Sequence, residues 1–249
     1  MPESIPLFLA AVAVGCYIQT VTGFALGIFV LTVVTLTQVA SIPVTATALN
    51  IMNLMLGSVV VLPRLRQVNW RLITLSLLGG MPAMALGVLL LDYLDRNAEH
   101  VLHLLLGLLI FAAGAVMSRR PNQRDTVSSP PAFIGAGALG GFFGGLFSIG
   151  GPPVVYQFYR QPVPAATLRL TLVALFAITS LGRLIVVTLN GDLTSEALHT
   201  GLIGLPLVAL VSWLGHRYPP RLSERTMRRL VFLLLMASGA AVTLLALLG

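Results

Sequence analysis

The chain has 249 residues, of which 57% are hydrophobic and only 9% are charged, a composition that excludes a soluble globular domain and indicates a polytopic helical membrane protein. The net charge of +7 comes from 15 basic residues that are all arginine. Most of these arginines lie in short loops between apolar segments, which is typical of loop anchoring at a membrane and not of a nucleic-acid-binding face.

Eight apolar segments follow one another along the chain. Each is long enough to cross about 30 Å of hydrocarbon as a helix that rises about 1.5 Å per residue. A polar linker separates the first four segments from the last four. We therefore expect a first transmembrane repeat over 1–118, a cytoplasmic linker over 119–131 and a second transmembrane repeat over 132–249. The segments are 5–37, 43–62, 72–91, 101–118, 132–159, 165–189, 197–214 and 230–248.

The fifth segment contains the stretch GGFFGGLFSIGGPPVVYQ, residues 140–157. Pro152 and Pro153 end a helix that arrives from the N-terminal side, and they suit the first turn of a new helix. The new N-terminus would present unpaired backbone N–H groups and a positive dipole end, which favour an anion. Transporters build substrate sites from such broken helices. Glycines at this spacing are also typical of a packing seam between two helices, although a seam does not require a break.

The charges of the loops predict how the segments cross the membrane. Arginines mark the loops 64–71, 119–124 and 217–229 as cytoplasmic, whereas acidic residues mark 92–99 and 190–196 as external. Segments five, six and seven join two cytoplasmic loops, and three crossings cannot do that. We therefore predict that the fifth segment is re-entrant. If the first segment is built in the same way from the outside, the halves form an inverted-topology repeat.

The two halves are weakly similar in sequence. Gly15–Gly27, with the sequence GCYIQTVTGFALG, aligns with Gly140–Pro152, and Pro43 and Pro164 each open the segment that follows a break. In the paired stretches QTVTGFALG and FSIGGPPVVY and in the loop RLRQVNWR, the chain resembles the sulfite exporter TauE/SafE family of small-anion permeases, also called the TSUP family. The resemblance covers nearly the whole chain.

The resemblance implies transport, usually export, of sulfite, an organosulfonate such as sulfoacetate, or a related small anion across a bacterial-type inner membrane. The expected partners are this anion and the lipid bilayer, without nucleic acid and without a cofactor or metal. A homo-oligomer is left open, and so is another permeant such as a carboxylate, thiosulfate or sulfate.

The first break supplies hydrogen-bond donors for an oxyanion. Gln19, Thr20 and Thr22 carry amide or hydroxyl protons, and the backbone at Gly23 and Phe24 can add N–H groups. The second break offers Ser148 and the backbone of Ile149, Gly150 and Gly151. The alternative for each hydroxyl is a hydrogen bond to a carbonyl one turn back in its own helix.

Four further polar residues are candidates for the site. Arg183 is the one charge well inside a predicted span, which makes it a functional hypothesis, unless its side chain extends to the external surface. Arg169 opens the sixth segment and is either a gate or a topology anchor. Asn50 and Asn53 share one face of the second segment, where they either line the path or join helices.

Two other classes of function compete with a permease. A membrane-embedded hydrolase needs a buried Ser–His pair or two aspartates within the spans, but the spans contain no Asp or Glu. A non-catalytic assembly subunit does not need two matched breaks. The lack of carboxylates in the spans also argues against a buried carboxylate relay for protons.

Reporter fusions test the topology. We expect the N-terminus and the C-terminus to face outside, and fusions after Arg124 and after Gln161 both to report the cytoplasm, because the fifth segment returns to the side from which it came. An external signal after Gln161 together with a cytoplasmic C-terminus would contradict the re-entrant arrangement.

Overall fold

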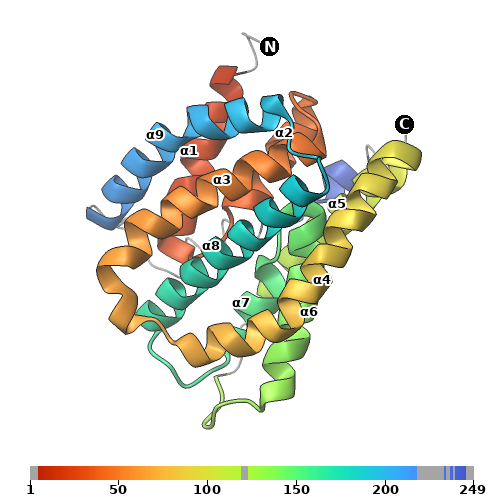
Figure 1. Ribbon diagram of the computed structural model, residues 1–249. Helices are drawn as coiled ribbons and strands as arrows, with labels where there is room; N and C mark the ends of the chain where they lie inside the picture. The colour runs from red at the N-terminus through yellow and green to blue at the C-terminus, as the bar shows by residue number, and fades with distance from the viewer. Residues whose placement is uncertain (1–4, 119–122, 218–232, 234–235, 238, 245–249) are drawn as a thin grey trace.

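The computed structural model describes residues 5–118, 123–217, 233, 236–237 and 239–244, and within these it contains helices and no strand. The elements are α1 (Ile5–Thr22), α2 (Leu26–Thr37), α3 (Ile42–Val61), the short 3-10 helix η1 (Leu62–Gln67), α4 (Trp70–Asn97), α5 (Glu99–Ser118), α6 (Pro130–Phe147), α7 (Gly151–Tyr159), α8 (Ala165–Leu189) and α9 (Ser195–Arg217) (Figure 1).

Five of the described helices are long and apolar enough to cross a membrane, namely α3 with η1, α4, α6, α8 and α9. The apolar helices α1, α2 and α5 are shorter. Most of the predicted eighth segment lies outside the described residues. Its described part is helical and packs against α5, where Gly239 contacts Phe111 and Thr243 contacts Gly107.

The predicted break in the fifth segment is confirmed, since α6 ends at Phe147 and α7 begins at Gly151 with prolines in its first turn. The helix α7 then folds back along α6, and we call this pair the second hairpin. The two ends of the hairpin are joined, because the N–H of Arg124 donates to the carbonyl of Arg160 at 2.8 Å and the N–H of Ser128 donates to Gln161 Oε1 at 2.8 Å. The segment therefore enters and leaves at one end of the molecule.

The first segment forms a similar hairpin, with α1 ending at Thr22 and α2 beginning at Leu26. We call this pair the first hairpin. A Cβ on Gly15 would lie 3.2 Å from Leu26 Cδ1, so the start of α2 lies against the middle of α1.

The two hairpins enter the molecule from opposite ends (Figure 1). The helix α6 runs parallel to α4, as Ser76 contacts Gly137 and Met84 contacts Gly145, so both begin at the same end. At the other end of α4, Arg96 pairs with Asp192 at 3.6 Å, just before the start of α9. The helix α1 runs parallel to α9 and therefore begins at that second end, because Cys16 contacts Val208 and Thr20 contacts Gly215.

Glycines bring the backbones of α4 and α6 into direct contact. Three of them recur every fourth residue on α6, at Gly137, Gly141 and Gly145, and an added Cβ on each would meet a backbone carbonyl oxygen of α4. This spacing lets two helices approach more closely than side chains would permit. Some glycines of the fifth segment thus lie at the break and others form a packing seam, two roles that the sequence presented as alternatives.

A methyl group at the seam should destabilise the fold. In Gly141→Ala the new Cβ would meet the carbonyl oxygen of Gly80, and a backbone atom cannot turn aside. We expect a cost of about 1–3 kcal/mol, seen as a lower melting temperature of the detergent-purified protein.

The matched control lies on the same helix. A Cβ on Gly135 would meet nothing within 4 Å, so Gly135→Ala should melt at or above the parent temperature because alanine favours the helix. Equal melting temperatures for the two variants would contradict the seam.

Candidate functional site

The two breaks carry the only non-glycine residues with positive φ in the described chain, apart from Gln38 at the end of α2. Ala25 has a φ of 108° immediately before α2, and Ser148 has a φ of 55° immediately after α6. Side chains disfavour this backbone region, so the surrounding structure must hold both residues in place. Such held strain is typical of functional sites.

The tips of the two hairpins meet. A Cβ on Gly27 would lie 2.8 Å from the carbonyl oxygen of Ser148, and a Cβ on Gly151 would lie 3.6 Å from Cβ of Phe24. The absence of side chains at these glycines lets the start of α2 approach the second break. The contact brings together two stretches far apart in the sequence, as expected if both build one site.

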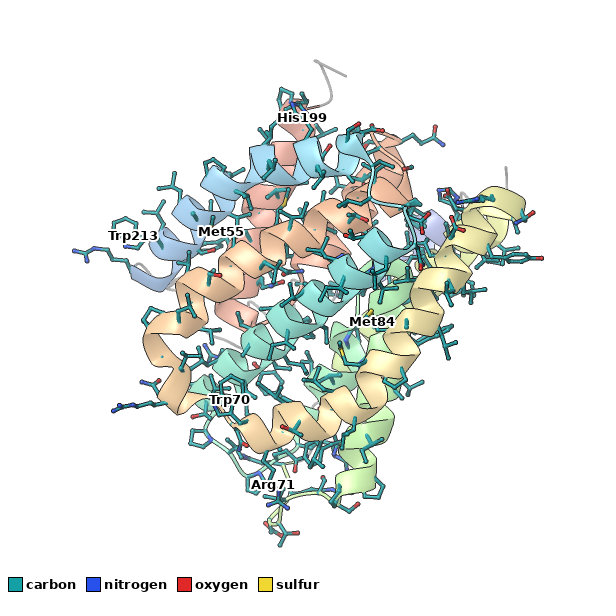
Figure 2. The ribbon with its side chains drawn as sticks, in the orientation of Figure 1. Met55, Trp70, Arg71, Met84, His199 and Trp213 are labelled. Carbon is teal, nitrogen blue, oxygen red and sulfur yellow. The ribbon has the colours of Figure 1, made fainter. Side chains whose placement is uncertain are left out.

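A cavity of about 60 Å³ lies beside this contact, enough for a few water molecules or a small anion. Met84, which borders it, lies between α4 and α8 (Figure 2). Eight of the residues predicted from the sequence line the cavity: Gln19, Phe24, Asn50, Asn53, Ser148, Ile149, Gly150 and Gly151.

Gln19 connects the first break to α3. Its Oε1 accepts the N–H of Leu26, the first residue of α2, at 2.9 Å, and its Nε2 donates to Asn53 Oδ1 at 2.9 Å. Gln19 therefore acts as a side-chain cap for a helix that begins in the interior. The amide oxygen of Asn53 is thus occupied, while its NH₂ group makes no hydrogen bond among the described residues.

Two other predicted donors are directed at a carbonyl of α3. Ser148 Oγ donates to the carbonyl of Ala46 at 2.9 Å, and Asn50 Nδ2 donates to the same carbonyl at 2.6 Å. Asn50 thus bonds one turn back in its own helix, whereas Ser148 reaches across from the second break. Ser148 therefore holds the tip of the second hairpin against α3.

Backbone N–H groups at both breaks are left without partners. Among the described residues, none accepts a hydrogen bond from the N–H of Gly27 or Ile28 at the start of α2, or from that of Ile149 or Gly150 before α7. All four residues line the cavity. Unpaired N–H groups at two helix N-termini give the cavity a positive potential that favours an anion.

Arg183 is buried in the interior and does not extend to a surface, since only 1% of it is exposed. Its Nε donates to the carbonyl of Gly145 at 2.8 Å and its Nη1 to Thr47 Oγ1 at 3.4 Å. The ion pairs within the described residues involve Arg96 with Asp92 and Asp192, and Arg183 has no carboxylate partner there. Arg183 lies one turn beyond Thr179 and Ser180, which line the cavity, but it is not itself a lining residue.

The remaining predicted residues do not line the cavity. Thr20 Oγ1 donates to the carbonyl of Tyr17 at 2.7 Å and packs against Gly215 of α9, so its hydroxyl follows the intrahelical alternative. Gly23 and Arg169 contact each other, with a Cβ on Gly23 lying 3.3 Å from Cα of Arg169. The side chain of Thr22 lies outside the described residues.

Sequence reasoning missed three hydroxyl residues of the lining: Ser76 on α4, and Thr179 and Ser180 on α8. Their signal was a polar residue in the middle of an apolar span. Hydroxyls occur in many membrane helices with no role beyond bonding their own backbone, so this signal alone did not select them. No group of three or more His, Cys, Asp or Glu residues in the described chain is arranged to hold a metal ion.

Comparisons with known proteins identify the family of the chain. Residues 7–242 match the model of the family described as sulfite exporter TauE/SafE. A relative from Cupriavidus necator, named "Probable sulfite/organosulfonate exporter TauE", is 33% identical over 235 residues, which are 94% of this chain and 92% of the relative. No solved structure matches the chain. The chain is therefore a multi-pass membrane transporter and not an enzyme, and it belongs to the sulfite exporter TauE/SafE family.

Proposed function

We propose that this protein is a secondary permease that exports a small sulfur oxyanion, sulfite or an organosulfonate such as sulfoacetate, across the inner membrane. The observation that carries the proposal is the meeting of two interior helix breaks, from opposite ends of the molecule, at one polar-lined cavity. The name of the relative from Cupriavidus necator, which specifies sulfite and organosulfonate, supports the sulfur oxyanion as the substrate class.

The lining favours an anion over a cation. Its polar side chains are amides and hydroxyls, and the lining includes no Asp or Glu. We propose that Asn53 and the free N–H groups at the two breaks contact the permeant. Gln19, Asn50 and Ser148 hold these donors in position, and Arg183 adds a positive charge behind the lining.

We propose that the two halves, 1–118 and 132–249, are inverted repeats joined by a cytoplasmic linker over 119–131. The helix contacts support this relation, because exchanging the halves maps the largest contacts onto one another. The helix α4 packs against α6 as α9 packs against α1, and α3 packs against α9 as α8 packs against α4. The helices α3 and α8, which are equivalent in the two halves, pack against each other, as a pseudo-twofold axis between the halves requires.

The proposed direction follows from the membrane potential. An inside-negative potential drives an anion outward with about 2.3 kcal/mol per charge per 100 mV. An export driven by this potential needs no proton-coupling residue, and no carboxylate lines the cavity.

Flux measurements test the function directly. Liposomes that contain the purified protein are loaded with sulfite or sulfoacetate, and an inside-negative potential is imposed. We expect saturable efflux well above that of protein-free liposomes, and faster efflux as the potential increases. Efflux at the protein-free rate for both anions would contradict the proposed function.

Arg183→Gln should reduce the flux at least tenfold while the protein remains folded. The physical reason is that an unpaired interior cation attracts an anion strongly where little water screens it. Lysine should restore the flux only in part, because it keeps the charge and loses the planar fork of donors that binds Gly145 and Thr47.

The matched control is Arg71→Gln. Arg71 is exposed at the start of α4, at one end of the molecule, so its neutralisation should leave the flux nearly unchanged (Figure 2). Flux is compared at equal amounts of folded protein per liposome. Parent-level flux in Arg183→Gln would remove Arg183 from the site.

A further inference from the structure

Most side-chain donors around the cavity already have an acceptor within the protein. Ser148 and Asn50 donate to the carbonyl of Ala46, and Gln19 donates to Asn53. Thr179 Oγ1 donates to the carbonyl of Leu175 one turn back at 3.1 Å. These hydrogen bonds shape the cavity, and they occupy the hydroxyl protons of Ser148 and Thr179 and one amide proton each of Asn50 and Gln19.

Ser76 differs from all of them. It is 2% exposed, it lines the cavity, and its Oγ has no hydrogen-bond partner within the described residues. A hydroxyl inside a helix ordinarily donates to the carbonyl one turn back, as Thr74 of the same helix does to Trp70 at 3.0 Å. A buried hydroxyl without a partner is costly, so its retention at a cavity wall points to a ligand that satisfies it.

The position of Ser76 is fixed by its backbone. Its Cα and carbonyl lie against Gly137 of the α4–α6 seam, where no side chain separates the two helices. The seam therefore fixes the position of the Ser76 backbone beside the cavity. The seam holds one free donor on the α4 side of the cavity.

The free donors reach the cavity from four elements. Asn53 belongs to α3 and Ser76 belongs to α4. The N–H groups of Gly27 and Ile28 belong to α2, and those of Ile149 and Gly150 belong to the second break. Donors that converge from several elements suit an anion with three oxygens on one centre. Sulfite and the –SO₃⁻ group of a sulfonate have three such oxygens, whereas a carboxylate has two.

We infer that Ser76 is a specificity-determining residue that donates its hydroxyl proton to one oxygen of a bound sulfite or sulfonate group. The inference rests on the proposed function, because it assigns a contact within the same cavity. Its chemistry is a charge-assisted hydrogen bond, which is stronger than a bond between neutral groups.

The first test removes only the hydroxyl. Ser76→Ala adds no atom to the seam, so we expect an unchanged or higher melting temperature. The half-saturating concentration for sulfite efflux should rise on the order of tenfold, as expected for the loss of one hydrogen bond to an ion. The control Thr74→Ala, on the exposed side of the same helix, should leave that concentration unchanged.

Selectivity forms the second arm of this test. The parent should prefer methanesulfonate to acetate as a competitor of sulfite efflux, and Ser76→Ala should reduce that preference. An unchanged half-saturating concentration in Ser76→Ala, while the parent transports sulfite, would overturn the contact and leave the proposed function intact. An equal loss for both competitors would overturn the role in specificity.

A second experiment detects occupancy without transport. Ser76→Cys is placed in a Cys16→Ala background, which removes the protein's single native cysteine. A sulfonate-bearing methanethiosulfonate reagent should label the new thiol, and methanesulfonate should slow the labelling, whereas sodium chloride at equal ionic strength should not. Absence of labelling, or a rate that methanesulfonate does not change, would overturn the inference.

Discussion

A helix that ends inside an apolar structure leaves peptide N–H and C=O groups that water cannot reach. The rest of this structure depends on which of those groups find a hydrogen-bond partner within the protein. At the first break one N–H is capped by the side chain of Gln19, while neighbouring N–H groups are left open to a cavity. At the second break Pro152 and Pro153 remove two N–H groups altogether. Some backbone N–H groups at each break therefore have a partner or are absent. The N–H groups without a partner among the described residues all belong to residues that line the cavity.

Arg183 belongs to the same electrostatic arrangement. Its guanidinium binds the carbonyl of Gly145 near the end of α6, where the helix dipole is negative, and Thr47 of α3. A carboxylate partner would have neutralised the charge, and none accompanies it within the described residues. The cation thus adds to the positive potential of two helix N-termini, and all three contributions have the same sign.

The sequence predicted the second break because Gly-Gly-Pro-Pro has a local meaning that does not depend on the rest of the fold. The first break was predicted from the weak similarity of the two halves. The return of the fifth segment to its own side was also accessible, since the parity of arginine-rich loops is a property of the whole chain. The directions of individual side chains could not be predicted from the sequence. Gln19 and Thr20 are neighbours on α1, yet Gln19 faces the cavity and Thr20 faces α9, and only the packing of α9 separates them.

The same limit explains Ser76 and Arg183. Whether an interior hydroxyl bonds its own helix or remains free depends on rotamer and neighbours, which a linear pattern does not encode. Arg183 was recognisable as a charge in a span, but the sequence did not show that its guanidinium binds the carbonyl of Gly145 in the interior. A long-range contact of this kind requires the register of α6 against α8.

The glycine seam makes the two hairpins mechanically unequal. Where α6 meets α4, backbone lies on backbone, and sliding one helix along the other would drive carbonyl oxygens into Cα atoms. The helices α4 and α6 thus behave as a single rigid body. The corresponding contact of α1 with α9 includes the side chains of Cys16, Thr20 and Ser212, which can change rotamer as the helices shift. A relative displacement that opens the cavity therefore meets least resistance around the first hairpin, with the second serving as its fixed support.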